Sequence, residues 1–286
     1  MLYPLADQQR KLIKSLSAEN SSETITNKKE IRAVGLRRTG NHAVLNWILS
    51  QQAGEVFHLN NVAPGTNPYR YKRDNLLRYH PEHFKMAAVY DRQAKGEFLQ
   101  RDCLIHSYED CGLKQLTQRR FERNRSLYLG RSAQRLELLI LRDPFNLFAS
   151  RLKRGYLSTR MRGTSMGDLW LEYAREFLGE SQHLGENLVC VNYNRWFTEV
   201  EYRRGLAARL GLTFSDAGID QVTGFGGGSS FAGTQVNGRS LDVLNRWQAF
   251  SDDPTFRSLF ENEEIWTYSE RIFGPIPGTV KNLRPA

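Results

Sequence analysis

Two short segments of the chain carry residue types suited to binding phosphate. The first reads GLRRTGNH, at residues 35–42, and follows an apolar run at 31–36. Its two glycines have the spacing of a P-loop, in which backbone N–H groups and the start of the next helix attract phosphate. Asn41 and His42 replace the Lys and the Ser or Thr that a nucleotide kinase uses with Mg·ATP. The segment therefore suits a phosphate group better than it suits kinase chemistry.

The second segment reads LRDPFNLFAS, at residues 141–150, and also begins at the end of an apolar run. Pro144 suits the first turn of a helix, which places Arg142 at a strand end and Ser150 on the helix that follows. Together these two side chains can hold one phosphate. A salt bridge between Arg142 and a neighbouring carboxylate is the alternative interpretation of the same residues.

Arginine supplies most of the positive charge. The chain has 30 Arg and 10 Lys against 31 acidic residues, a net charge of +9. Residues 119–162 alone hold eleven Arg and one Lys against three acids, which is also +9. The planar guanidinium binds phosphate and sulfate in a bidentate manner, so the surplus indicates an anionic partner. A solvated, arginine-rich helix is the alternative for this stretch.

The elements that must position these residues alternate along the chain. Short aliphatic runs predict strands buried in a parallel sheet, at residues 31–36, 55–59, 103–106, 136–141 and 187–193. Amphipathic stretches predict helices at residues 41–52, 167–183 and 198–210. This alternation predicts an α/β fold, a single domain with a central parallel sheet flanked by helices.

Three further segments lie outside the alternating pattern. The polar residues 1–29 are expected to form a peripheral N-terminal segment ahead of the main domain at 30–286. Residues 60–100, rich in Tyr, Arg, Pro and Asn, are expected to be an insertion that lines a substrate cleft. The Gly/Ser-rich residues 224–240 predict a mobile loop. We expect no membrane span, because no run of about 18 apolar residues occurs, and a cytoplasmic protein, because the N-terminus has no apolar signal region.

Together, the two phosphate-binding segments resemble motifs of the sulfotransferases that use 3′-phosphoadenosine-5′-phosphosulfate (PAPS). RRTGNHA at 37–43 resembles the family's 5′-phosphosulfate loop, and RDPFNLFAS at 142–150 resembles its 3′-phosphate motif. VNYNRW at 191–196 is similar to the strand and tyrosine near the adenine, and GGGSSF at 226–231 to the loop that closes over the nucleotide. The four segments follow the family's order. The resemblance implies a P-loop-like sulfotransferase fold.

The resemblance also assigns roles to individual residues. Arg38 stands where the family usually has a lysine beside the transferred group, and as a permanent cation it would stabilise the leaving oxygen. The residues expected around the 5′-phosphate are Arg37, Arg38, Thr39, Gly40, Asn41 and His42. The residues expected around the rest of the nucleotide are Arg142 and Ser150 at the 3′-phosphate, Tyr193 at the adenine, and Ser229, Ser230 and Phe231 in the closing loop.

The reaction also needs a group that takes the proton of the acceptor hydroxyl. Cytosolic members of the family use a histidine at the end of a strand, and the run CLIHSYED at 103–110 occupies the comparable place. The resemblance therefore points to His106 as the base. Glu109 is the runner-up, because carboxylate bases also occur in the superfamily. A histidine that is merely satisfied within the fold is the alternative for His106.

The expected reaction transfers a sulfuryl group from PAPS to a hydroxyl or amine of a small molecule, releasing 3′-phosphoadenosine-5′-phosphate (PAP) without a metal ion. The general character of the sequence suggests a natural-product enzyme, cyanobacterial as one candidate, acting on an alkaloid of the saxitoxin type. A sugar or polysaccharide acceptor is the alternative. A P-loop nucleotide kinase and a nucleic-acid binder are further alternatives, although we expect neither nucleic acid nor membrane as a partner.

Overall fold

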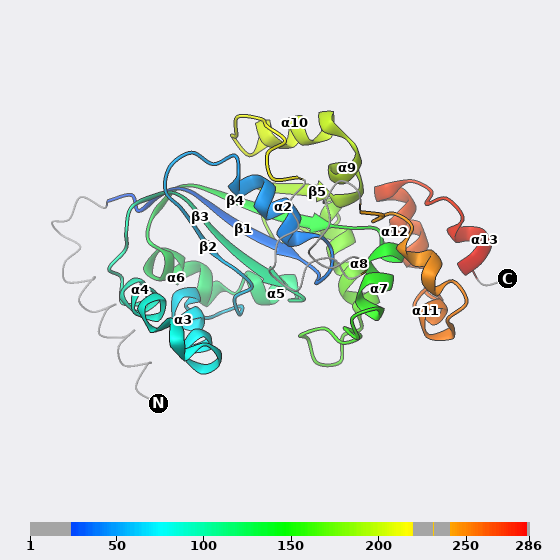
Figure 1. The fold of residues 1–286 in the computed structure, drawn as a ribbon, viewed down its shortest axis with the longest axis horizontal. Coiled ribbons are helices and arrows are strands. Elements are labelled where there is room, and N and C mark those ends of the chain that lie inside the picture. The colour runs from blue at the N-terminus through cyan, green and yellow to red at the C-terminus, as the bar shows by residue number, and fades with distance from the viewer. Residues whose placement is uncertain (1–23, 220–230, 232–240, 285–286) are drawn as a thin grey trace.

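The computed structural model describes residues 24–219, 231 and 241–284. A parallel sheet with the strand order β2-β3-β1-β4-β5 forms the centre (Figure 1). Its strands are β1 (Asn27–Gly35), β2 (Val56–Leu59), β3 (Arg101–Glu109), β4 (Ser132–Leu141) and β5 (Leu188–Asn192). The predicted α/β class with a central parallel sheet flanked by helices is confirmed.

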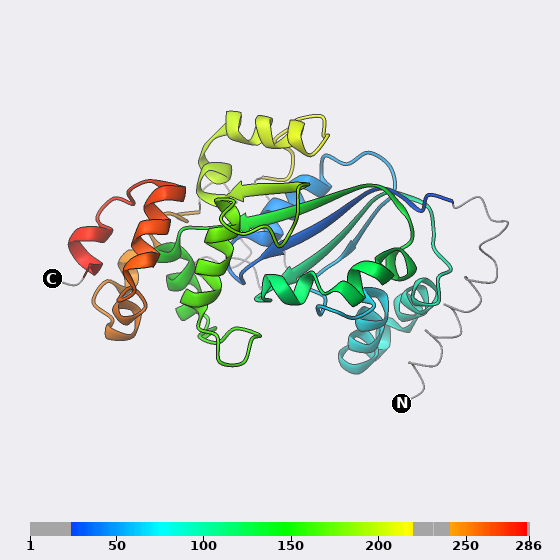
Figure 2. The same ribbon diagram turned by 180° about the vertical axis from the view of Figure 1, so that it is seen from behind.

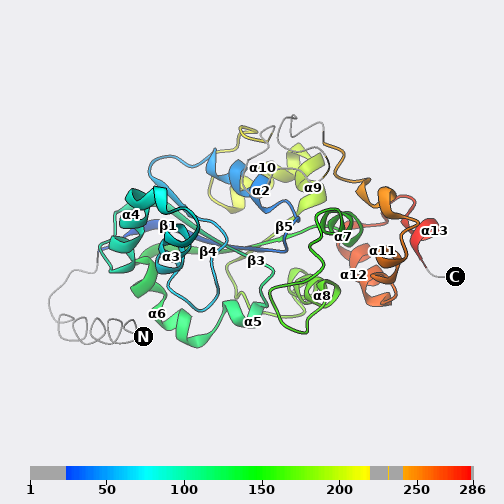
Figure 3. The same cartoon turned by 60° about the horizontal axis from the view of Figure 1, so that its bottom comes forward.

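Helices cover both faces of the sheet, because the strands bury aliphatic side chains on both sides. Ile31 and Ile105 face α2 (Asn41–Leu49), α9 (Tyr193–Thr198) and α10 (Val200–Arg209). Val34 and Leu104 face the opposite core, which α6 (Arg119–Leu129), α7 (Pro144–Leu152) and α8 (Met166–Phe177) complete. Figure 3 shows α2, α9 and α10 on one side of the strands and α5 (Leu113–Leu116), α6 and α8 on the other.

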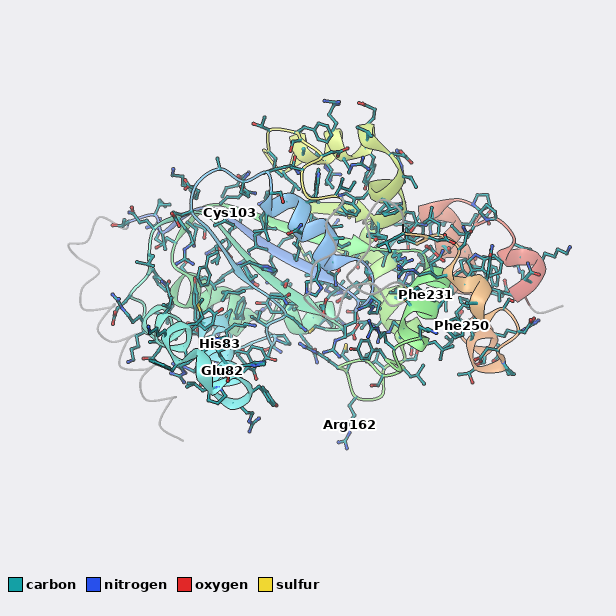
Figure 4. All side chains as sticks on the ribbon, in the orientation of Figure 1. Glu82, His83, Cys103, Arg162, Phe231 and Phe250 are labelled. Carbon is teal, nitrogen blue, oxygen red and sulfur yellow. The ribbon has the colours of Figure 1, made fainter. Side chains whose placement is uncertain are left out.

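Further helices extend the molecule at its two ends (Figures 1 and 2). The segment expected to be a cleft insertion contains α3 (Pro68–Tyr79), η1 (Pro81–His83) and α4 (Phe84–Ala94), and α3 packs against α4, α6 and β2. Glu82 and His83 mark the turn between α3 and α4 (Figure 4). The opposite end holds η4 (Arg246–Phe250), α11 (Pro254–Ser258), α12 (Glu263–Phe273) and α13 (Thr279–Leu283). Within the described ranges, no helix is long and apolar enough to cross a membrane.

The strand order places β1 between β3 and β4, so the chain adds β2 and β3 on one side of β1 and then crosses to add β4 and β5 on the other. In open parallel sheets, ligands bind at the carboxyl ends of the strands where the direction of building reverses. The ends of β1, β3 and β4 lie at this point, and they are followed by the loop at 36–40, by Asp110 and by Arg142. The fold therefore brings both predicted phosphate-binding segments to one edge.

A network of buried charges crosses the middle of the sheet. In β1 and β3, its members lie both within the aliphatic runs predicted at 31–36 and 103–106 and among the polar residues by which these strands exceed those runs. Arg32 pairs in register with His106 and with Glu137 on the two neighbouring strands. Arg32 Nε lies 2.5 Å from Glu137 Oε2, and Arg125 of α6 contacts Glu30 at 2.5 Å and Glu137 at 2.9 Å. Burial alone raises the pKa of Glu30, but the hydrogen bond with His106 and the charge of Arg125 hold it well below its usual value.

We predict that Glu30→Gln lowers the free energy of unfolding by about 3–5 kcal/mol, because it leaves Arg125 buried with one counter-charge fewer. The matched control is Glu199→Gln, which removes an exposed partner of Arg195 and should change stability by less than about 1 kcal/mol. Urea unfolding at pH 7 measures both. Since the pKa of Glu30 is lowered on folding, its contribution is lost as the pH falls, so wild type and Glu30→Gln should converge in acid. Equal losses in the two variants at pH 7 would contradict the network's role.

Candidate functional site

The loop after β1 makes a tight turn that exposes its backbone to the carboxyl edge of the sheet. Arg38 and Gly40 have φ angles of 72° and 105°, and Thr39 N donates a hydrogen bond to Leu36 O at 3.2 Å. Asn41, the first residue of α2, donates to the same carbonyl at 3.0 Å. Thr39 Oγ1 is buried and has no hydrogen-bond partner among the described residues. The turn thus brings a buried hydroxyl without a hydrogen-bond partner close in sequence to a helix N-terminus, two features that anion-binding loops use.

Tyr193 closes one side of this loop. It is the first residue of α9, directly after β5, and its ring stacks on Trp196 with centroids 5.5 Å apart. A Cβ atom on Gly40 would lie 2.0 Å from the Tyr193 ring, so only glycine allows the ring to approach the loop. The Arg142 guanidinium lies 5.3 Å from the centre of the same ring. Segments that are 50 to 150 residues apart in sequence, at 37–43, 142–150 and 191–196, therefore meet here.

Arg142 is a buried cation that forms no hydrogen bond with a carboxylate of the described residues. It is 1% exposed, and its guanidinium donates to Arg38 O and Ser150 Oγ, each at 3.3 Å, and to the carbonyl of Val243. Its Nε has no hydrogen-bond partner among the described residues. Burial lowers the pKa of Arg142. The neighbouring carboxylate of Asp143 caps α7 by accepting from Asn146 N at 2.8 Å, and its charge acts on Arg142 without a hydrogen bond between the two side chains in the described part of the chain.

Arg246 is a second cation at the same place, and no sequence motif pointed to it. It lies on η4, and its Nη1 donates to Ser150 Oγ at 3.1 Å. Burial and the charges of Arg142 and Arg38 lower the pKa of Arg246 to about 9. Burial and the charges of Arg154 and Arg142 likewise lower the pKa of Arg38. We call Arg38, Arg142, Arg154 and Arg246 the arginine cluster.

Phe231 is the one residue of the predicted closing segment at 226–231 that the structure describes, and it lies beside these cations. Its ring centre is 5.2 Å from the Arg246 guanidinium and 6.0 Å from Lys153 Nζ. It also approaches Phe250, with centroids 6.4 Å apart (Figure 4). Ser229 and Ser230 lie outside the described residues, so their predicted contacts with the nucleotide stay predictions.

Two carboxylates stand on the other side of the loop, at the end of β3. Glu109 accepts a hydrogen bond from Asn41 Nδ2 at 3.0 Å and lies 3.8 Å from Arg37 Nε. Asp110 accepts from Arg37 N at 2.9 Å. The Arg37 guanidinium lies 5.7 Å from the centre of the Tyr156 ring. The side chains of Arg37 and Asn41 therefore face these carboxylates, and not the arginine cluster.

His106 lies inside β3 and not at the strand end, where the sequence predicted it. It lies three residues before the end of β3 and is fully buried. Its Nε2 lies 3.1 Å from Glu30 Oε1 and its Nδ1 lies 3.1 Å from the Tyr108 hydroxyl. Burial lowers the pKa of His106. The structure thus gives His106 the satisfied interior role and brings Glu109 to the loop.

His42, at the start of α2, contacts a residue of another segment. His42 Nε2 lies 3.2 Å from Asn60 Oδ1, which joins the start of α2 to the segment after β2. Across the described ranges, no three His, Cys, Asp or Glu side chains are grouped so as to hold a metal ion.

We predict that Gly40→Ala lowers the free energy of unfolding by about 1–3 kcal/mol more than Gly179→Ala. Both glycines have positive φ, so both variants lose about 1–2 kcal/mol to backbone strain. A Cβ at Gly179 meets nothing within 4 Å, whereas a Cβ at Gly40 overlaps the Tyr193 ring. Urea unfolding of the two variants isolates the effect of the overlap, and equal stabilities would show that the ring does not depend on Gly40.

No family model matches the chain, and no curated protein matches its sequence. Two solved structures are similar in fold. Mouse sulfotransferase SULT7A1 complexed with PAP has a TM-score of 0.45 at 13% identity, covering 91% of this chain and 90% of its own. The sulfotransferase domain of the olefin synthase from Synechococcus PCC 7002 has a TM-score of 0.50 at 13% identity, covering 90% of this chain and 99% of that domain. On this likeness to the Synechococcus domain, the chain has the fold of a sulfotransferase.

Proposed function

We propose that this chain is a sulfotransferase that binds PAPS and transfers its sulfuryl group to a hydroxyl or amine of a small molecule. The observation that carries the proposal is the arginine cluster. A buried cation is unfavourable unless a counter-charge accompanies it, and the described residues that hydrogen-bond to Arg142 offer carbonyl and hydroxyl oxygens but no carboxylate. A dianionic phosphate placed beside Arg142, Arg246 and Ser150 would supply that counter-charge through charge-assisted hydrogen bonds.

The presence of two adjoining anion-binding features favours a nucleotide that carries phosphates on both the 3′ and the 5′ position of its ribose. The 3′-phosphate would be held by Arg142, Ser150 and Arg246. The 5′-phosphosulfate would lie at the loop of residues 36–40, where Thr39 Oγ1 and the N-terminus of α2 are available. Arg142 itself joins the two features, because its Nη1 donates to both Arg38 O and Ser150 Oγ. The adenine would lie near Tyr193, as the family resemblance implies.

The transfer step assigns separate tasks to Arg38 and Glu109. The acceptor oxygen would form a bond to sulfur while the bond from sulfur to the 5′-phosphate oxygen of PAPS breaks. Arg38 would stabilise the negative charge that grows on that leaving oxygen. The proton of the acceptor would pass to Glu109, whose carboxylate Asn41 orients at 3.0 Å. We therefore propose Glu109, and not His106, as the base.

The acceptor would approach from the side of Glu109 that Arg37 and Tyr156 border. A natural-product hydroxyl and a sugar hydroxyl both fit this chemistry, since each presents an oxygen that becomes nucleophilic once its proton is removed. The affinity for PAP can be measured without an acceptor, whereas turnover has to be measured with acceptors of both kinds.

We predict that the wild-type protein binds PAP without magnesium and more tightly than it binds ATP. Arg142→Gln should weaken PAP by about 10- to 100-fold, because a hydrogen bond to a charged group contributes about 1.5–3 kcal/mol, and should change the affinity for adenosine 5′-phosphate little. Isothermal titration calorimetry measures each affinity. Arg195→Gln, which alters an exposed arginine, is the control. If the wild-type protein does not bind PAP, the sulfotransferase proposal fails.

We predict that Glu109→Gln lowers kcat by about 100- to 10,000-fold, because it removes the group that takes the proton, and leaves PAP affinity within about threefold. Transfer from radiolabelled PAPS to a panel of phenol, sugar and alkaloid acceptors measures turnover, with Glu201→Gln on the exposed face of α10 as the control. Glu109→Asp should restore part of the activity. Full activity of Glu109→Gln together with loss of turnover in a folded His106→Gln would return the role of base to His106.

A further inference from the structure

Arg151 is a buried residue of α7, next to Ser150, that neither phosphate-binding motif includes. Its side chain is fully buried, and its guanidinium donates in four directions. Nη1 donates to Asp110 Oδ1 at 2.7 Å and to Arg37 O at 3.2 Å. Nε donates to Tyr156 O at 3.1 Å, and Nη2 to Ser158 O at 2.9 Å. One side chain thus joins the loop after β1, the end of β3 and the segment after α7.

Asp110 extends this connection to the other side of Arg37. Its Oδ1 accepts from Arg37 N at 2.9 Å, and its own backbone N donates to Gly35 O at 3.2 Å. Arg151 holds Arg37 O, so the two partners of one buried ion pair grip the N–H and the carbonyl of a single residue. The next residue, Arg38, has a φ of 72°, a conformation that L-residues adopt only when their surroundings hold them there.

We propose that Arg151 is a positioning residue that sets the conformation of the 5′-phosphate loop by holding the backbone of Arg37 together with Asp110. The proposal rests on the proposed function, in which this loop binds the 5′-phosphate end of the nucleotide. None of these four hydrogen bonds of the Arg151 guanidinium goes to Ser150, Arg142 or Arg246. Its effect is therefore on the 5′ end of the nucleotide and not on the 3′ end.

The difference between the 5′ and 3′ ends of the nucleotide distinguishes a positioning role of Arg151 from a purely structural role. If Arg151 only stabilised the interior, its loss would lower stability and weaken every ligand of the site to a similar degree. If it positions the loop, its loss weakens ligands in proportion to their dependence on the 5′-phosphate. Adenosine 5′-phosphate, adenosine 3′-phosphate and PAP carry the two phosphates separately and together, so they distinguish the two roles.

The experiment measures the affinities of these three ligands for wild type and Arg151→Gln by isothermal titration calorimetry, with displacement of PAP for the weaker ligands. We expect adenosine 5′-phosphate and PAP to bind about tenfold or more weakly to Arg151→Gln, and adenosine 3′-phosphate to bind within about threefold of wild type. Circular dichroism checks that the variant is folded. Arg175→Gln, which removes an exposed partner of Glu264 on the neighbouring α8, is the control and should bind all three ligands as wild type does.

Two further variants decide the matter if Arg151→Gln does not fold. Arg151→Lys keeps the charge beside Asp110 but cannot reach all three carbonyls, so it should recover part of the 5′-phosphate affinity. Asp110→Asn should weaken the same two ligands that Arg151→Gln weakens. Equal loss for the 3′- and 5′-phosphate ligands, or no loss for either, would overturn the positioning role while PAP binding by the wild type upholds the proposed function. Absence of PAP binding by the wild type would instead refute the proposed function.

Discussion

Arg142 and Arg246 donate to the same hydroxyl, Ser150 Oγ, at the point where β4 ends. Two buried guanidinium groups on one small acceptor repel each other, and burial together with the charge of Arg142 lowers the pKa of Arg246. Within the described residues, the hydrogen bonds of Arg142 go to two carbonyls and a hydroxyl, and the charge of Asp143 does not offset the burial that lowers the pKa of Arg142. The site therefore stores an unfavourable interaction that an anion can relieve, and the affinity for that anion includes the energy so released.

The interior contains a second group of buried charges with the opposite property. Around Arg32, each cation contacts at least one carboxylate, some of which are shared, and the network spans three strands and α6. The arginines of the stretch at 119–162 therefore belong to different groups. Arg125 and Arg135 belong to the balanced network, Arg142 and Arg154 to the arginine cluster, and Arg162 extends into solvent (Figure 4). The net charge of this stretch does not distinguish the arginines of the network from those of the arginine cluster.

The segments that the sequence placed at the same edge of the sheet as the structure does are those defined by local geometry. An apolar run, two glycines and a helix start lie within a few residues of each other, so the loop at 36–40 and the turn at Arg142 could be placed without knowing the sheet. The roles of His106, Arg151 and Arg246 depend on which strands are neighbours. His106 is paired with Arg32 only because β1 and β3 lie side by side in one register, and Arg246 reaches Ser150 from a helix almost a hundred residues away.

The proposed chemistry depends on coupling the two sides of the loop. A permanent cation at Arg38 can stabilise a leaving oxygen but does not readily supply a proton, so the proton that must move is the one on the acceptor. The group that takes this proton has to lie at a fixed position relative to the sulfuryl group. Asn41 provides this connection, since its amide donates both to Leu36 O within the loop and to Glu109 at the end of β3. The conformation that binds the 5′-phosphate is therefore also the conformation that orients the base.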